Sequence, residues 1–252
     1  MEDTLKKRSQ KLQLSLYQSE CSLSEVIQLK LQTEFLNGRP LSYILGLSEF
    51  YGSEFYVDEN VLIPRPETEL MVDLLVKEFG HKKNIQTLLD VGTGSGVILL
   101  SLLKNNVGIK GVGVDLSPAA LKVAQTNSTR QRVPARFLES DRLSQVSETF
   151  DLIVSNPPYI KLSAHKNLVQ RTVDVFEPKL ALYLPDGEYE AWFREFFLQV
   201  KTHLNPQGIF MMEGHELELQ TQVSLLTELG FQQAKVIKDY SGHDRFLKAQ
   251  VI

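Results

Sequence analysis

The chain has little cysteine, no long apolar run and no excess of positive charge. Its one cysteine, Cys21, excludes an internal disulfide and is typical of a protein kept in a reducing compartment. No apolar stretch reaches the roughly 18 residues that a membrane-spanning helix needs. The segment from Met1 to Arg8 also lacks the apolar core of a secretory signal. We therefore expect a cytoplasmic protein that does not bind membranes.

The charge balance argues against a dedicated nucleic-acid binder. The chain has 27 Lys and Arg against 31 Asp and Glu, a net charge of −4, whereas such binders usually present a basic face. Its five histidines are scattered, and His215-Glu216 lacks the second histidine of a zinc-binding helix. We expect neither direct contact with nucleic acid nor a bound metal.

A length of 252 residues with 42% hydrophobic content suits one large domain with an appendage. Residues 1–38 have the apolar spacing of two short helices but too few residues for a core of their own. Residues 39–64 are read as a β-hairpin linker, in which 43–47 and 49–57 are extended with a turn at Gly52-Ser53. Residues 65–252 form the main domain, beginning with a helix that Gly80 ends.

Strands and helices alternate through the main domain. The predicted strands are 87–91, 111–114, 135–138, 150–155, 208–213, 231–237 and 245–251. The predicted helices between them are 97–103, 118–129, 189–204 and 217–229. Ser117-Pro118 marks the start of the second, as an N-cap followed by proline at the first helical position. Such β-α-β repeats predict an α/β, Rossmann-like fold with a seven-stranded, mainly parallel sheet and helices on both faces. Residues 160–187 are read as a long, polar, irregular loop, and a loop of that length is usually functional.

The fourth predicted strand, 150–155, ends abruptly in Asn156-Pro157-Pro158-Tyr159. Neither proline has an N–H and both fix φ, so strand pairing stops there. The stiff turn falls at the sheet edge where open α/β folds bind ligands. The Asn156 side-chain oxygen and a backbone carbonyl can each accept one hydrogen of a planar NH2 group, with Tyr159 against its flat face. The alternative is a rigid exit from the strand without a ligand.

A glycine-rich turn follows the first predicted strand. The segment from Asp90 to Gly96 reads Asp-Val-Gly-Thr-Gly-Ser-Gly, and Asp115 closes the next strand, placed to accept hydrogen bonds from ribose hydroxyls. A dinucleotide fingerprint is not met, because its third glycine position is Val97. The spacing resembles the S-adenosylmethionine site of Rossmann-like methyltransferases, in which the acid before the glycines would face the methionine ammonium. The alternative here is a strand–helix turn that binds nothing.

Taken together, these motifs resemble the peptide-chain release factor glutamine methyltransferases. The likeness runs from about Arg39 to Phe246. It is carried by Ile63-Pro64-Arg65-Pro66-Glu67-Thr68-Glu69, the turn from Asp90 to Gly96, Asp115, Asn156-Pro157-Pro158-Tyr159, Phe176-Glu177-Pro178, Glu213-Gly214-His215 and Asp239-Tyr240.

The resemblance implies that residues 65–252 are an S-adenosylmethionine-dependent methyltransferase domain. It implies methyl transfer to the glutamine nitrogen of the Gly-Gly-Gln motif in class I release factors, the protein partner, in support of translation termination. The implied catalytic and substrate-binding residues are Asn156, Pro157, Pro158 and Tyr159. The implied cofactor-binding residues are Asp90, Gly92, Thr93, Gly94, Ser95, Gly96, Asp115, Leu116, Asp141, Arg142 and Asn156. Asp141 and Arg142 lie near the adenine, on which the Arg142 guanidinium can stack, and Pro64 to Glu67 help to shape the cofactor pocket.

Other readings stay open at this point. Exocyclic amines of adenine or guanine present the same NH2 geometry, although enzymes acting on them need a basic channel. A ribosomal-protein glutamine is a further substrate, and a non-catalytic binding protein on the same scaffold is a different class. A monomer is expected.

Overall fold

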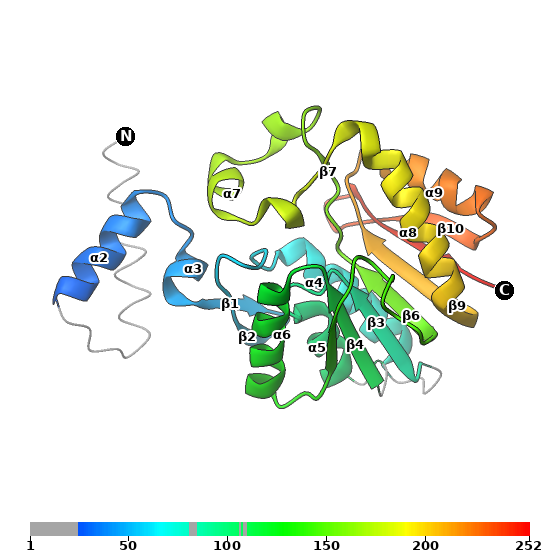
Figure 1. Cartoon of the computed structure of the whole chain (residues 1–252), viewed down its shortest axis with the longest axis horizontal. Helices are drawn as coiled ribbons and strands as arrows, with labels where there is room; N and C mark the ends of the chain where they lie inside the picture. Colours follow the sequence, from blue (N-terminus) through cyan, green and yellow to red (C-terminus); the bar gives the residue numbers. More distant parts are fainter. Residues whose placement is uncertain (1–24, 81–84, 106, 108–109) are drawn as a thin grey trace.

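The computed structural model describes residues 25–80, 85–105, 107 and 110–252 (Figure 1). The helix expected in residues 1–24 lies outside this part of the chain. The described chain begins with α2 (Glu25–Leu36), which Figure 1 shows at the end of the molecule away from α8 and α9.

Seven strands form the central sheet, in the order β10-β11-β9-β6-β3-β4-β5. All adjacent pairs from β9 to β5 are parallel, and β11 runs antiparallel to both of its neighbours. The predicted Rossmann-like, mainly parallel sheet is therefore confirmed. The strands are β3 (Thr87–Val91), β4 (Lys110–Asp115), β5 (Arg136–Glu139), β6 (Phe150–Ser155), β9 (Leu204–Glu213), β10 (Gln232–Lys238) and β11 (Asp244–Gln250).

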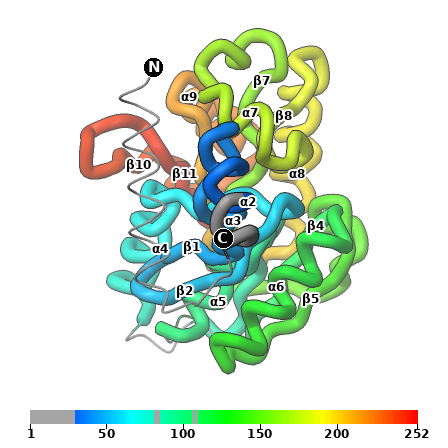
Figure 2. Tube along the Cα trace, turned by 90° about the vertical axis from the view of Figure 1, so that its left-hand side faces the viewer, coloured from blue at the N-terminus to red at the C-terminus, as the bar shows by residue number. Residues whose placement is uncertain are grey.

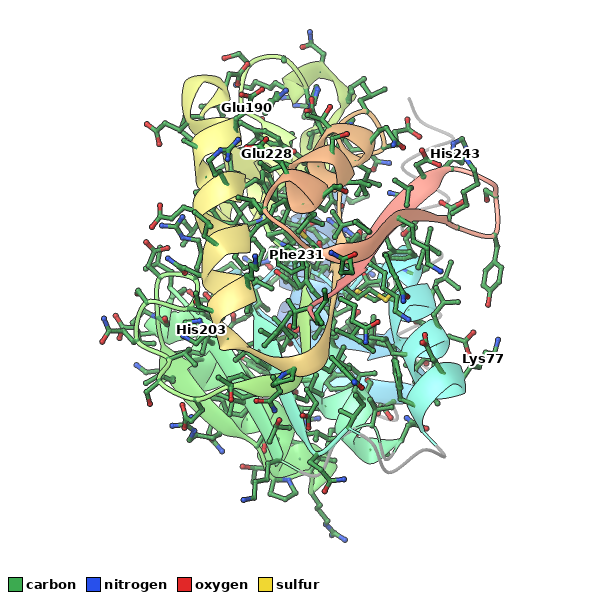
Figure 3. All side chains as sticks on the ribbon, turned by 90° about the vertical axis from the view of Figure 1, so that its right-hand side faces the viewer. Lys77, Glu190, His203, Glu228, Phe231 and His243 are labelled. Carbon is green, nitrogen blue, oxygen red and sulfur yellow. The ribbon has the colours of Figure 1, made fainter. Side chains whose placement is uncertain are left out.

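Two helical layers cover the sheet because its central strands are apolar on both faces. In β3, Leu88 and Leu89 are both fully buried but belong to different cores, as alternate residues of a strand must. One core is shared with α8 (Tyr189–His203) and α9 (Leu219–Glu228), and the other with α4 (Pro66–Phe79) and α5 (Val97–Lys104). Figure 3 shows α8 and α9 side by side, and the β10–β11 hairpin extending past the sheet toward His243.

The helix starts follow local sequence signals. The Ser117 side-chain oxygen accepts a hydrogen bond from the backbone N–H of Ala120 at 3.2 Å and caps α6 (Pro118–Gln131), as predicted. Pro66 occupies the first turn of α4, where its missing N–H costs nothing. Both helices begin at the carboxyl-terminal edge of the sheet, and the residues before their first turns, Arg65 and Ser117, line the site described below.

The linker contains a short helix that the sequence did not indicate. Residues 43–47 were expected to be extended, but α3 (Leu41–Leu45) is helical, and that expectation is wrong. Gly46 ends it in the left-handed conformation, with φ of 67°. The helix buries Tyr43, whose hydroxyl donates to the Val61 carbonyl oxygen at 2.6 Å. Tertiary burial of one aromatic residue thus outweighs the weak strand pattern.

The predicted hairpin is present as β1 (Leu47–Phe50) and β2 (Ser53–Tyr56). Figure 2 shows it beside α6. Asn127 of α6, which is fully buried, joins the two. Its Nδ2 donates to the carbonyl oxygens of Tyr56 (2.9 Å) and Ser95 (2.8 Å), and its Oδ1 accepts from the Tyr56 N–H at 2.7 Å. One amide therefore fastens the hairpin to the glycine-rich turn.

Residues 160–187 are more ordered than the irregular loop expected there, so that expectation is corrected. The segment contains α7 (Arg171–Phe176), and its two ends meet in a short parallel pair, β7 (Ile160–Lys161) with β8 (Tyr183–Leu184). Hydrogen bonds between the ends compensate for the polar composition that suggested a loop. The segment leaves the sheet and returns at nearly the same place.

Within the described ranges, no helix combines the length and apolar character required to cross a bilayer.

Replacing Asn127 with Ala is expected to lower the free energy of unfolding by about 2–4 kcal/mol, because three backbone groups, which are buried or partly buried, lose their partner. Urea denaturation measures this. The matched control is Gln125→Ala on the exposed face of the same helix, with an expected change within about 0.5 kcal/mol. Equal stability of the two variants would contradict the role given to Asn127.

Candidate functional site

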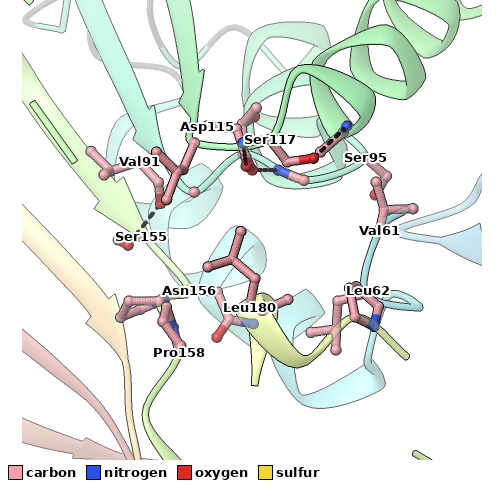
Figure 4. A pocket seen from close by; sticks show the side chains of 18 of the residues that line it. Val61, Leu62, Val91, Ser95, Asp115, Ser117, Ser155, Asn156, Pro158 and Leu180 are labelled. Carbon is pink, nitrogen blue, oxygen red and sulfur yellow. Dashed lines mark hydrogen bonds between the residues drawn. The ribbon is translucent and has the colours of Figure 1, made fainter. Parts of the chain in front are cut away.

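A cavity opens at the carboxyl ends of β3, β4 and β6 (Figure 4). In Figure 4, Asp115 and Ser117 lie on one side, and Asn156 and Pro158 face them across the opening. The other walls come from the linker (60–65), from the returning part of the 160–187 segment and from Trp192 of α8. The two sequence motifs that predicted a site thus meet across one cavity.

The glycine-rich turn forms the floor with its backbone. Gly92, Gly94 and Gly96 all have positive φ, at 70°, 54° and 80°. A Cβ added to Gly94 would meet no atom within 4 Å, so the backbone there is open to a ligand. A Cβ on Gly96 would lie 3.3 Å from the Ala124 Cβ. Gly96 does not line the cavity, and its lack of a side chain lets α5 and α6 approach each other.

Asp115 is held in place by backbone donors. Its Oδ2 accepts from the Gly94 N–H and its Oδ1 from the Ser117 N–H, each at 2.9 Å. Burial raises the pKa of Asp115, while hydrogen bonds from the backbone of Ser117 and Gly94 act in the opposite direction. A carboxylate has about four acceptor positions, so two remain for hydroxyl donors in the cavity. This geometry suits a ribose.

Asp90 lies beneath the turn rather than in the cavity wall. It is fully buried, and the Thr93 hydroxyl donates to its Oδ2 at 2.8 Å. Its Oδ1 accepts no hydrogen bond from the residues that the structure describes. Burial raises the pKa of Asp90 to about 7, chiefly because the charged form loses its hydration. Thr93 stands between this carboxyl and the cavity, so the expected contact with an ammonium group stays a prediction.

The expected adenine end of the cavity has a paired arginine and an aromatic wall. Arg142 donates to Asp141 and to Glu195, and its guanidinium carbon lies 5.3 Å from the centre of the Trp192 ring. Asp141, Arg142 and Trp192 all line the cavity beside apolar residues such as Leu116 and Leu180. No sequence signal marked Trp192 as a wall residue.

The Asn-Pro-Pro-Tyr turn is fixed at its base by β3. The buried Ser155 hydroxyl donates to the Val91 carbonyl oxygen at 2.8 Å, which joins the ends of β6 and β3 (Figure 4). The Asn156 Nδ2 donates to the Thr68 Oγ1 at 3.3 Å. Asn156, Pro157 and Pro158 line the cavity. The Asn156 side chain, which was predicted to bind a planar NH2 group, therefore lines the same cavity as the glycine-rich turn.

Tyr159 points the other way, into a second cavity that also has Asn156 and Pro157 in its wall. Its hydroxyl donates to the Glu213 Oε1 at 3.1 Å. Burial raises the pKa of Glu213, against the opposing hydrogen bonds from Thr68 and Tyr159 and the charge of Arg245. The two cavities meet at Asn156 and Pro157, so a group held there is reachable from both sides.

Glu177 is a residue whose role the sequence did not reveal. It is 4% exposed, and its carboxylate accepts from the Ile63 N–H at 3.0 Å and from the Arg65 guanidinium at 2.6 Å. This contact joins the linker to the 160–187 segment over more than 110 residues of chain. Both segments line the cavity, so Glu177 holds two of its walls together.

The structure thus brings most of the predicted residues into the lining of one cavity. They are Gly92, Thr93, Gly94, Ser95, Asp115, Leu116, Asp141, Arg142, Asn156, Pro157 and Pro158. Asp90 and Gly96 lie behind the wall, and Tyr159 lines the second cavity. Of Pro64 to Glu67, Pro64 and Arg65 are in the first cavity. An open backbone turn, a carboxylate and an apolar slot fit the nucleoside and amino-acid parts of S-adenosylmethionine.

Comparison with known proteins gives consistent results. A family model described as "Methyltransferase small domain" matches residues 66–182. A release factor glutamine methyltransferase of Flavobacterium psychrophilum is 36% identical over 229 residues, covering 89% of this chain and 78% of that protein. Its namesake from Chlorobaculum tepidum is 38% identical over 226 residues, covering 85% and 75%.

Solved structures show the same fold. A methyltransferase from Pyrococcus furiosus superimposes with a TM-score of 0.59 at 20% identity, covering 88% of this chain and 98% of that one. The 16S rRNA N2 G1207 methyltransferase of T. thermophilus, solved with AdoMet and guanosine, has a TM-score of 0.59 at 20% identity, covering 82% and 50%.

Glu177→Gln is expected to lower the free energy of unfolding by about 1–3 kcal/mol, because Arg65 loses its charged partner and a buried acceptor is weakened. Limited proteolysis should also cut faster within 160–187. The control is Glu188→Gln, an exposed glutamate at the end of the same segment. If Glu177→Gln resists urea and protease as well as the control does, the contacts of Glu177 with Ile63 and Arg65 do not stabilise the fold.

Proposed function

This chain belongs to the family of release factor glutamine methyltransferases, and we propose that it transfers a methyl group from S-adenosylmethionine to the glutamine side-chain nitrogen in the Gly-Gly-Gln motif of a class I release factor. One observation carries the proposal. Asn156 and Pro157 stand in the wall between two cavities, one suited to the cofactor and the other open toward a protein substrate. A planar amide held by this turn faces the methyl donor.

The cofactor site uses the residues of the first cavity. Gly92 to Ser95 offer open backbone, Asp115 accepts the ribose hydroxyls, and the slot beside Arg142 and Trp192 takes the adenine. When bound, S-adenosylmethionine supplies an electrophilic methyl group on a sulfonium. Asp90, held beneath the turn by its hydrogen bond from Thr93, provides negative charge toward the methionine ammonium when its carboxyl is deprotonated.

The substrate nitrogen needs help, because the lone pair of a carboxamide is delocalised into its carbonyl. Asn156 Oδ1 and the Pro157 carbonyl oxygen each accept one of its hydrogens. This fixes the direction of the nitrogen lone pair and stabilises the positive charge that develops on nitrogen during attack. Orientation of this kind can lower a barrier by about 7–11 kcal/mol. The N–C bond forms as the methyl–sulfur bond breaks, S-adenosylhomocysteine leaves, and the methylated nitrogen then loses one of its protons to water. The turn acts by position and charge, without a proton-abstracting base.

The deciding experiment incubates the protein with methyl-labelled S-adenosylmethionine and a purified class I release factor. We expect label on the wild-type factor and none on a Gln→Ala variant of its Gly-Gly-Gln motif. In the same assay Asn156→Ala should lower kcat by at least about 100-fold and leave cofactor affinity, measured by calorimetry, nearly unchanged. Label retained on the Gln→Ala factor, or label found on added RNA or ribosomal protein instead, would refute the assignment.

Asp115→Asn is expected to weaken S-adenosylmethionine binding by about 2 kcal/mol, or roughly thirtyfold, because charge-assisted hydrogen bonds to the ribose are lost. Titration calorimetry measures this without a substrate. Glu139→Gln is the control, since Glu139 pairs with Asp115 in the sheet register but is exposed and lies outside the cavity. Equal affinities of the two variants would remove Asp115 from the cofactor site.

A further inference from the structure

The Asn156 side chain is the end of a buried hydrogen-bonded chain. Its Nδ2 donates to the Thr68 Oγ1 at 3.3 Å, and the Thr68 hydroxyl donates to the Glu213 Oε2 at 2.7 Å. We propose that Thr68 and Glu213 are positioning residues that hold the Asn156 amide with its oxygen, and not its NH2, toward the substrate nitrogen. This inference rests on the proposed function and adds the groups that orient its central residue.

The direction of the chain follows from what each group can do. In its charged form, which the hydrogen bonds from Thr68 and Tyr159 favour, Glu213 only accepts hydrogen bonds, so the Thr68 hydroxyl donates its single proton to it. The Thr68 oxygen is then left as an acceptor, and of the two ends of the Asn156 amide only the NH2 can donate to it. Oδ1 is therefore directed away from Thr68.

Burial makes this direction costly to reverse. Thr68 is 3% exposed and Glu213 is 1% exposed. With the Asn156 amide turned round, two acceptor oxygens would face each other at Thr68 in place of the present hydrogen bond. At the other end an NH2 would face the NH2 of the substrate, donor against donor. A reversed amide thus loses hydrogen bonds at both ends.

Glu213 is itself fixed, because it holds both ends of the turn. Its second oxygen, Oε1, accepts from the Tyr159 hydroxyl at 3.1 Å. Asn156, through Thr68, and Tyr159 directly are thereby fastened to one carboxylate, with the two prolines between them. The three anchoring elements, α4, β6 and β9, are parts of the rigid scaffold rather than mobile loops.

Thr68→Val removes the hydroxyl and keeps the branched shape. We expect kcat for methylation of the release factor to fall by about 10–100-fold, with the KM for the factor changed much less and cofactor affinity unchanged. Thr68→Ser restores the hydroxyl and should recover most of kcat. Thr221→Val, at an exposed position of α9, is the control for threonine replacement and should match the wild type. Glu213→Gln leaves one acceptor oxygen for the two hydroxyls of Thr68 and Tyr159 and should lower kcat in the same way.

A second measurement needs no substrate. The side-chain NH2 signals of Asn156 in a 15N-labelled protein, assigned by their loss in Asn156→Ala, should shift in Thr68→Val and return in Thr68→Ser. Unshifted signals in Thr68→Val, or a kcat of this variant equal to that of the wild type, would overturn the proposal that Thr68 and Glu213 orient Asn156. If the wild-type protein transfers no label while the NH2 signals shift as expected, the proposed function fails and the orientation of Asn156 stands.

Discussion

The register between β3 and β6 is the constraint on which the site depends. Val91 and Ser155 are partners in this parallel pair, and the Ser155 hydroxyl also binds the Val91 carbonyl oxygen. The glycine-rich turn follows Val91, and the Asn-Pro-Pro-Tyr turn follows Ser155. A slip of the pairing would move the Asn-Pro-Pro-Tyr turn away from the glycine-rich turn, and a slip by one residue would also reverse the faces of β6. Alternate residues of these strands pack into two different cores, so a slip would remove each side chain from the space that it fills.

Buried polar side chains then hold the outer walls to this centre. Asn127 joins the hairpin to the glycine turn, Glu177 joins the linker to the 160–187 segment, and Glu213 joins α4 to the end of β6. Each satisfies groups that would otherwise be left unpaired in the interior. Because an unpaired buried group is costly, these contacts specify one arrangement of the walls as well as stabilising it.

The sequence predicted the sheet well because its strands carry strong local signals. β3 and β6 were placed at their observed bounds, and Ser117-Pro118 marked the start of α6. The α3 helix was missed, since five residues around Tyr43 are helical only through burial against the linker. The order in 160–187 was also missed, because β7 and β8 pair residues more than twenty positions apart. The motif residues lying at strand ends could be expected to converge, since parallel strands finish at one edge.

The supporting residues were beyond such reasoning. Thr68 contacts Glu213 across 145 positions, and Arg65 contacts Glu177 across 112. Thr68, Glu177 and Glu213 all stand in motifs of the family resemblance, yet a motif gives no partner. Trp192 and Asn127 look like ordinary helix residues. Their roles depend on contacts between segments far apart in the chain, and such contacts cannot be predicted from the local pattern of one sequence.

The pairing of β7 with β8 separates the Asn-Pro-Pro-Tyr turn from the segment that follows it. Ile160 comes directly after Tyr159, and its partner Tyr183 is where the chain returns. Residues 162–182 therefore form a closed excursion, fastened at its stem and held at Glu177. Closure entropy grows only slowly with loop length, so the part of this stretch before Glu177, which lies outside the first cavity, can change in length without disturbing the Asn-Pro-Pro-Tyr turn. The surface presented to the proposed protein substrate can therefore change, in evolution or by engineering, while the residues of the Asn-Pro-Pro-Tyr turn stay the same.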